Sequence, residues 1–147
     1  MGVEESGRTA TINFLDAVTL TGSFVESGEY RISPFAQIEL ILDYTMDAGE
    51  ADNDAILKVL LSEDGTNYHE YSIADDGDTA TDGVIEAILY ARRFVIEGEA
   101  GVKVTRWYAI PTSAKWIKVA AMERGITSEG GILTVKARVS NDLEDRS

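Results

Sequence analysis

His69 is the single histidine of the chain, and imidazole is the side chain best suited to acid–base chemistry near neutral pH. A catalytic triad would require a serine and an acid that converge on it, and nothing in the spacing of the sequence indicates such a set. Because Tyr68 and Tyr71 are its neighbours, we expect His69 to be a strand residue with a half-exposed ring. The chain has no cysteine, which excludes a disulfide, a thiolate nucleophile and a cysteine-ligated metal.

Carboxylates are abundant, with 26 Asp and Glu in the chain, so their number alone permits the acid and base pair of a glycosidase. Glu39 and Asp43 fall on one face of an expected strand, and Glu97 and Glu99 do so if their strand continues past Gly98. The wet face of a β-sandwich carries such residues without any catalytic role. We therefore predict no catalytic residue and no enzymatic activity. A small glycoside hydrolase or lyase remains a third hypothesis.

Two acidic loops contain the oxygen ligands that calcium requires. One is the segment 75–82, where Ala80 stands at the third ligand position of an EF-hand and no Glu closes the loop. The other contains Asp47, Glu50, Asp52 and Asp54. We favour solvated acidic turns at both places, and predict no metal and no cofactor.

Trp107 and Trp116 each fall on the face opposite the aliphatic residues of their strand, which indicates a contact surface. Such a surface could stack a sugar ring, or it could be covered by another protein subunit. We predict an interface formed by basic and aromatic residues of the C-terminal part: Arg92, Arg93, Arg106, Trp107, Lys115, Trp116 and Lys118.

The net charge of −13 is unevenly distributed along the chain. Residues 1–90 contain 19 acids and 3 bases, whereas residues 91–147 contain 7 acids and 10 bases. Bases and acids could pair inside one sandwich, which we favour, or the basic strands of one copy could meet the acidic loops of another. The acid excess argues against nucleic acid and anionic membranes as partners, and no apolar stretch approaches the roughly 18 residues that span a bilayer.

Apolar residues alternate with polar ones at a period of two through most of the chain, a pattern typical of half-buried strands. The clearest segments are 36–46, 102–110, 116–122 and 133–139, and weaker ones are 10–21, 29–33, 56–62 and 68–73. Segment 84–97 is ambiguous, and we favour a strand over a helix there. The spacing predicts an all-β fold, a jelly-roll-like antiparallel β-sandwich of about eight strands. We expect one domain at 10–140, a flexible N-terminal arm at 1–9 and a polar tail at 141–147.

Three segments together resemble a known family: 35–45 with its Leu-Asp-Tyr-Thr, 62–68 with its Ser-Glu-Asp-Gly turn, and 114–119 with its Lys-Trp-Ile-Lys-Val. In this order they resemble small β-sandwich proteins encoded among the structural genes of tailed bacteriophages. The resemblance implies a jelly-roll-like virion protein of the capsid decoration (cement) type, and it supplies no catalytic residues.

As partners, the resemblance implies the major capsid protein or other virion proteins, and a homo-oligomer, with a trimer favoured. Its implied location is the virion, after synthesis in the cytoplasm of the host bacterium. The alternative function is a carbohydrate-binding module, or a tail or receptor-binding accessory domain.

Overall fold

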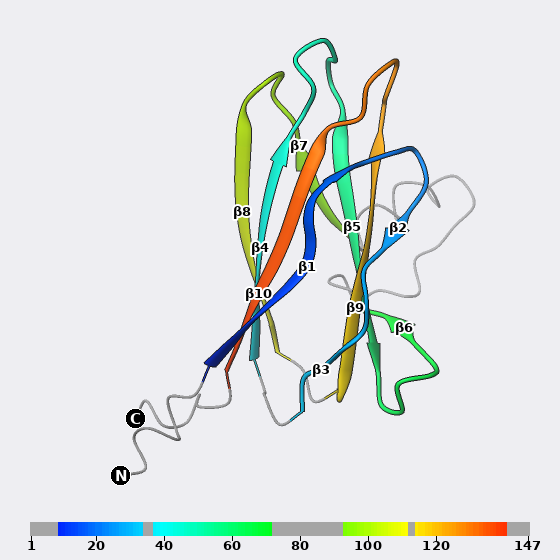
Figure 1. Cartoon of the computed structure of the whole chain (residues 1–147), viewed down its shortest axis with the longest axis vertical. Coiled ribbons are helices and arrows are strands. Elements are labelled where there is room, and N and C mark those ends of the chain that lie inside the picture. Colours follow the sequence, from blue (N-terminus) through cyan, green and yellow to red (C-terminus); the bar gives the residue numbers. More distant parts are fainter. Residues whose placement is uncertain (1–8, 34–36, 72–92, 112–113, 141–147) are drawn as a thin grey trace, which may run out of the picture.

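The computed structural model describes residues 9–33, 37–71, 93–111 and 114–140, and these residues form an all-β fold of ten strands in two antiparallel sheets (Figure 1). The predicted β-sandwich is confirmed. In chain order the strands are β1 (Thr9–Thr19), β2 (Val25–Glu26), β3 (Tyr30–Arg31), β4 (Gln37–Thr45), β5 (Asp54–Ser62), β6 (His69–Glu70), β7 (Phe94–Glu97), β8 (Lys103–Pro111), β9 (Trp116–Arg124) and β10 (Ile132–Ser140).

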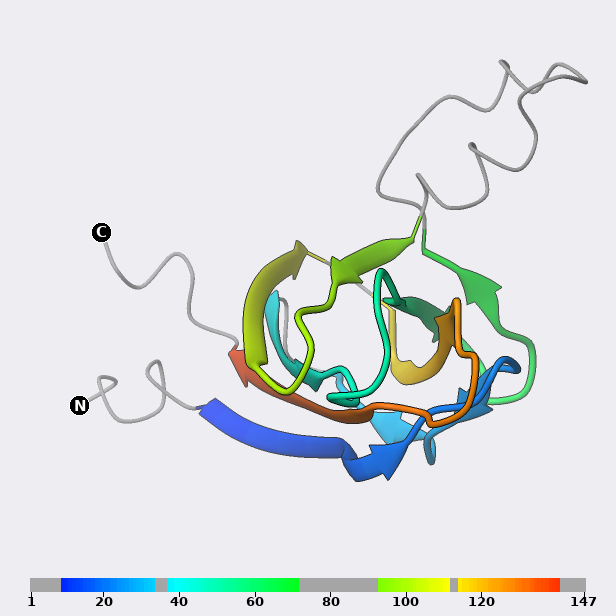
Figure 2. The same ribbon diagram turned by 90° about the horizontal axis from the view of Figure 1, so that it is seen from above.

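Sheet A has the strand order β1-β10-β4-β8, and sheet B has the order β2-β9-β5-β6, with β3 also paired to β9 and β7 to β5. The chain crosses from one sheet to the other at most connections, so most neighbours within a sheet, apart from β5 and β6, are distant in sequence. This is the strand arrangement of a jelly roll, with β2 and β3 sharing one strand position and β6 added at an edge. Figure 2 shows sheet A as a curved layer that faces sheet B.

The core lies between the sheets and is built from strict alternation in the central strands. On β4 the side chains of Ile38, Leu40, Leu42 and Tyr44 are fully buried, and on β10 Leu133, Val135, Ala137 and Val139 are buried opposite them. Sheet B contributes Leu57 and Val59 from β5 and Ile117 and Val119 from β9. Burial of each large aliphatic side chain is worth about 1.5–3 kcal/mol, so these four strands contribute much of the stability of the sandwich.

β1 departs from the predicted alternation of segment 10–21. Phe14 and Leu15 are adjacent and both buried, because the register with β10 shifts on either side of Leu15. Ala17 has a positive φ of 51°, and its N–H donates to Thr134 Oγ1 across the sheet at 3.0 Å. A β-bulge therefore replaces regular pairing here and bends β1 around the edge of the core.

The weaker strand predictions have mixed outcomes. In segment 68–73 the described residues, 68–71, contain only the two-residue β6, and 72–73 lie outside the described part of the chain. β2 was not predicted at all. In segment 84–97 the residues 94–97 form β7, as favoured, while 84–92 lie outside the described residues. The expected arm at 1–9, apart from Thr9 at the start of β1, and the tail at 141–147 also lie outside them. Across the described part of the chain, no helix has the length and apolarity to cross a membrane.

Candidate functional site

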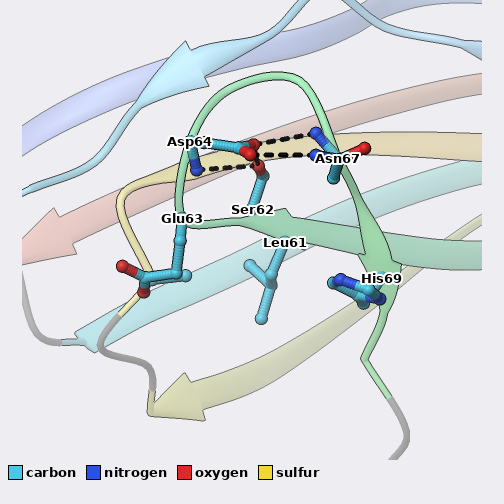
Figure 3. Close-up of a pocket in the computed structure, with 7 residues that line it drawn as sticks. Leu61, Ser62, Glu63, Asp64, Asn67 and His69 are labelled. Carbon is cyan, nitrogen blue, oxygen red and sulfur yellow. Dashed lines mark hydrogen bonds between the residues drawn. The ribbon is translucent and has the colours of Figure 1, made fainter.

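The turn between β5 and β6 borders an open pocket of about 400 Å³, lined by Leu61, Ser62, Glu63, Asp64, Asn67, His69 and Ala114 (Figure 3). The Ser62 hydroxyl donates to Asp64 Oδ1 at 3.0 Å and accepts the N–H of Gly65 at 2.9 Å. Its proton therefore points to Asp64, and His69 lies exposed on β6. The pocket accordingly has serine, acid and histidine without the serine–histidine hydrogen bond that nucleophilic catalysis uses.

Asp64 stabilises this turn. Its carboxylate accepts the backbone N–H groups of Asn67 and Thr66, both at 2.8 Å, and the Asn67 side chain at 2.9 Å. These hydrogen bonds hold the pKa of the Asp64 carboxyl well below its usual range, so it stays ionised as an acceptor. The Ser-x-Asp-Gly motif therefore stabilises the turn between β5 and β6.

Trp116 packs against the same turn. A Cβ on Gly65, whose φ is +78°, would lie 3.1 Å from the indole, so the glycine allows close approach of the ring. The Arg31 guanidinium lies over the indole at 5.6 Å from its centre. Trp116 is therefore half-buried by its own chain, and it is a poorer candidate for a stacking platform than the sequence indicates.

Glu50 lies in one of the two predicted acidic loops but is almost fully buried. Its carboxylate accepts the backbone N–H groups of Thr127, Ser128 and Glu129 at 2.8–2.9 Å, and the side-chain N–H of Asn53 at 3.0 Å. Its oxygens are thus occupied by N–H donors, and they tie the β4–β5 loop to the β9–β10 loop. The described residues contain no group of three or more His, Asp or Glu placed to bind a metal, and loop 75–82 lies outside them.

A second buried carboxylate, Glu123 on β9, was missed by the sequence analysis. It accepts the hydroxyl of Tyr44, the side-chain N–H of Asn53 at 3.2 Å and the N–H of Gly131 at 2.7 Å. Burial and the neighbouring Glu123 raise the pKa of the Tyr44 hydroxyl, so Tyr44 remains a donor. The set joins β4, β9 and two loops and serves the fold. Only its position at the end of an alternating strand distinguishes Glu123 in the sequence.

Ion pairs within the described residues gather on sheet B and its edges. They are Arg93–Glu70 at 2.8 Å, Lys118–Glu26 at 3.1 Å, Lys115–Glu63 at 4.0 Å and Arg124–Asp54. Each joins a base from residues 91–147 to an acid from residues 1–90. The favoured interpretation of the charge asymmetry, pairing inside one sandwich, therefore applies to sheet B.

The seven predicted interface residues do not form one patch. Arg106 and Trp107 lie on β8 in sheet A, whereas Lys115, Trp116 and Lys118 lie at or next to β9 in sheet B. Arg93 precedes β7, where it contacts Glu70 and the ring of Phe24. Arg92 lies outside the described residues.

The outer face of sheet A is the surface with the strongest signs of binding. Trp107 is 58% exposed near the middle of edge strand β8, and Ile41 stands opposite it on β4. Lys136 follows in the same row on β10, and Ile132 on that strand is 40% exposed. We call the outer surface of sheet A around Trp107 the Trp107 face; it is made by Trp107, Ile41, Ile132, Glu39, Asp43, Lys103, Lys136 and Arg138. An apolar centre with charged surroundings is typical of protein interfaces.

No known protein-family model matches the sequence, and no curated protein is significantly similar to it. Solved structures share the fold. The chain is similar to part of the T13 particle of the virus IBDV, with a TM-score of 0.53 and 11% identity over 92% of this chain and 31% of that one. It is similar to tripeptidyl peptidase 2, with a TM-score of 0.52 and 6% identity over 90% of this chain and 10% of the peptidase. For the PBSX exported protein XepA the TM-score is 0.51, with 11% identity over 92% of this chain and 38% of XepA.

This chain therefore spans only about a third of the IBDV and XepA chains and a tenth of the peptidase. At identities this low the likeness concerns the fold. A fold shared by a virus particle and a peptidase does not by itself assign a function.

Proposed function

We propose that the protein is a non-enzymatic structural protein of a phage virion, and within that class a capsid decoration protein. The observation that carries the proposal is the Trp107 face: a broad sheet surface with a large exposed aromatic side chain at its centre. Buried aromatic anchors supply much of the energy of protein interfaces, so a free face of this kind suits assembly with other virion proteins.

Three further observations support the proposal. The jelly-roll topology is also found in the IBDV particle, a virion assembly, and the sequence resembles phage structural proteins in three ordered segments. The polar groups that could suggest catalysis are engaged in turns and loop ties, as at Ser62 and Glu50. A decoration protein would stabilise the head by binding across joints between capsid subunits, because a ligand that binds only the assembled state favours that state.

Co-sedimentation with purified capsids of the parent phage that lack this protein tests the proposal. We expect the full chain to bind them and to raise the temperature at which they break open. Trp107→Ala should weaken binding by about tenfold or more, since loss of a central aromatic anchor costs about 2 kcal/mol. Thr66→Ala, an exposed change in the β5–β6 turn, is the control and should bind normally. A wild-type chain that ignores these capsids would contradict the decoration role.

The exposed indole of Trp107 also favours one alternative, a carbohydrate-binding module or receptor-binding accessory domain. Sugar rings stack on exposed aromatic side chains, and Trp107 is free to do so while Trp116 is packed against Gly65. A glycan array separates the alternatives. Specific glycan binding that Trp107→Ala abolishes, together with no affinity for capsids, would replace the decoration role with this one.

A further inference from the structure

The outer strands of the two sheets differ in how well they are protected against pairing with a further strand. β1 carries a bulge, at which Ala17 has a positive φ of 51°. On sheet B the outer strands β2, β3 and β6 have two residues each, and β7 has four. Bulges and short strands are common means by which β-proteins prevent edge-to-edge pairing.

β8 has neither kind of protection. It pairs with β4 over nine residues, from Lys103 to Pro111, without a register shift. Within the described residues no strand pairs with its other side, and Figure 1 shows it as the outermost strand of sheet A. In an antiparallel ladder the N–H and C=O groups of alternate residues point to opposite sides of the strand. β8 therefore presents a row of backbone donors and acceptors at its free edge.

Two cations accompany this edge. Arg106 stands opposite the buried Leu42 of β4, so it belongs to the core side of sheet A, yet it is exposed. Sheet B therefore does not cover β8 at this point. The Arg106 guanidinium donates to the Thr105 carbonyl at 3.0 Å, and neither Arg106 nor Lys103 joins an ion pair within the described residues.

These side chains decide which strand the edge accepts. A residue of an added strand points to the same side of the sheet as the residue opposite it. An uncharged residue opposite Arg106 would desolvate the guanidinium without compensation, and a second copy of β8 would bring Lys103 and Arg106 of both chains together. An acidic residue opposite Arg106 instead forms an ion pair. Apolar residues two positions away on either side then cover Val104 and Tyr108, which are only partly buried.

We propose that the free edge of β8 binds an extended segment of a partner protein by strand addition, and that Arg106 selects an acidic residue in that segment. The segment has the alternating form apolar-x-acidic-x-apolar, centred opposite Arg106. Backbone hydrogen bonds supply affinity in this binding mode, and the alternate side chains supply specificity. The proposal deepens the virion role, on which it rests for the partner being another virion protein. Because Trp107 lies on the same strand, the added strand widens the Trp107 face.

Synthetic peptides test the edge without a capsid. The probe is acetyl-Thr-Val-Thr-Glu-Thr-Val-Thr-amide, and the control peptide has Lys in place of the central Glu. In NMR titrations we expect the full chain to bind the Glu peptide about tenfold or more tightly than the Lys peptide, because like charges meet in the second complex. Arg106→Glu, with its fold verified by circular dichroism, should reverse this preference. Lys115→Glu, the same charge change on sheet B, should leave it unchanged.

Hydrogen exchange locates the bound peptide. Strand addition should slow exchange at alternate backbone N–H groups of β8, those that face away from β4, and leave the bulged edge strand β1 unchanged. A peptide held on a sheet face by side chains alone would give no such alternation. Absence of binding, equal binding of the two peptides, or protection elsewhere than on β8 overturns the proposal. Protection of these groups in a dimer without peptide also overturns it, because a second copy then occupies the edge.

Capsids that lack this protein separate the proposal from the decoration role. Arg106→Glu should weaken capsid binding by about tenfold, and Lys115→Glu should not. Normal capsid binding by Arg106→Glu refutes strand addition and leaves the decoration role standing. Selective binding of the Glu peptide by a wild-type chain that ignores the capsids does the reverse.

Discussion

Glu50 is an acidic residue whose carboxylate stabilises the fold, because it holds two loops together. The side chain of Asn53 and the backbone N–H groups of Glu129, Thr127 and Ser128 hold the pKa of the Glu50 carboxyl well below its usual value of about 4.5. A folded-state pKa below the unfolded value means that stability is fully present above about pH 4.5. It is lost as pH falls further and the carboxylate is protonated.

Glu50→Gln should therefore lower the melting temperature at about pH 7 and flatten its decline between about pH 5 and pH 3, because the glutamine does not titrate. Melting curves of both proteins across that range measure the effect. Glu63→Gln, a change at an exposed carboxylate, serves as the control and should follow the wild-type profile. If the Glu50→Gln and wild-type profiles run parallel, the carboxylate is not the group that ties the loops.

The connection between β9 and β10 depends on close backbone approach. A Cβ at Gly130 would overlap the Leu20 carbonyl oxygen, and one at Gly131 would lie 2.7 Å from the Thr45 carbonyl oxygen. The Leu20 N–H donates to the Gly131 carbonyl at 2.8 Å, which joins the end of β1 to this connection. Glycine is therefore needed here because carbonyl groups of neighbouring strands occupy the space of a side chain.

Gly130→Ala should lower the free energy of unfolding by about 1–3 kcal/mol, since the Leu20 backbone must shift. Gly22→Ala is a matched control, because a Cβ there meets nothing within 4 Å, and it should change stability by less than about 0.5 kcal/mol. Urea unfolding at equilibrium measures both. Equal stability of the two variants would show that the approach at Gly130 is not required.

The same elements show what a sequence can predict. The alternation of β4 and β10 predicted their buried faces because each is flanked on both sides in sheet A and has one face on the core. The bulge of β1 depends on Thr134, which lies 117 residues from Ala17, and no local pattern encodes it. β2 and β6 have two residues each, too few for any period.

Some residues of the predicted interface are exposed and others are covered, for a similar reason. Trp107 and Trp116 have the same relation to their strands, and the approach of Gly65 and Arg31 from other elements covers only Trp116. Likewise, Lys118 and Arg93 are engaged because Glu26 and Glu70 lie beside them in the folded chain. The types and spacing of these residues predicted a basic and aromatic interface. Which of their side chains remain exposed depends on neighbours that are distant in sequence.

At the scale of the whole molecule, the acidic and basic parts of the chain are interleaved. β10 lies between β1 and β4, and β9 lies between β2 and β5, so C-terminal strands occupy the centre of both sheets. Neither part of the sequence can form a sheet of this topology without the other. The charge asymmetry along the chain thus becomes ion pairing across sheet B, while on the outer face of sheet A the bases of β10 lie beside the acids Glu39 and Asp43 of β4.

This topology predicts one cooperative and slow folding transition. All-β sandwiches whose contacts join distant segments fold in milliseconds to seconds, because loop closure precedes most stabilising contacts. Trp116 reports on sheet B through its packing against Gly65, and a Trp107→Phe background removes the emission of the exposed indole. In that background, urea transitions followed by fluorescence and by far-ultraviolet circular dichroism should coincide, with single-exponential refolding in that time range. Separate transitions would mean that sheet B, which fluorescence follows, forms independently of the strands of sheet A that complete the core.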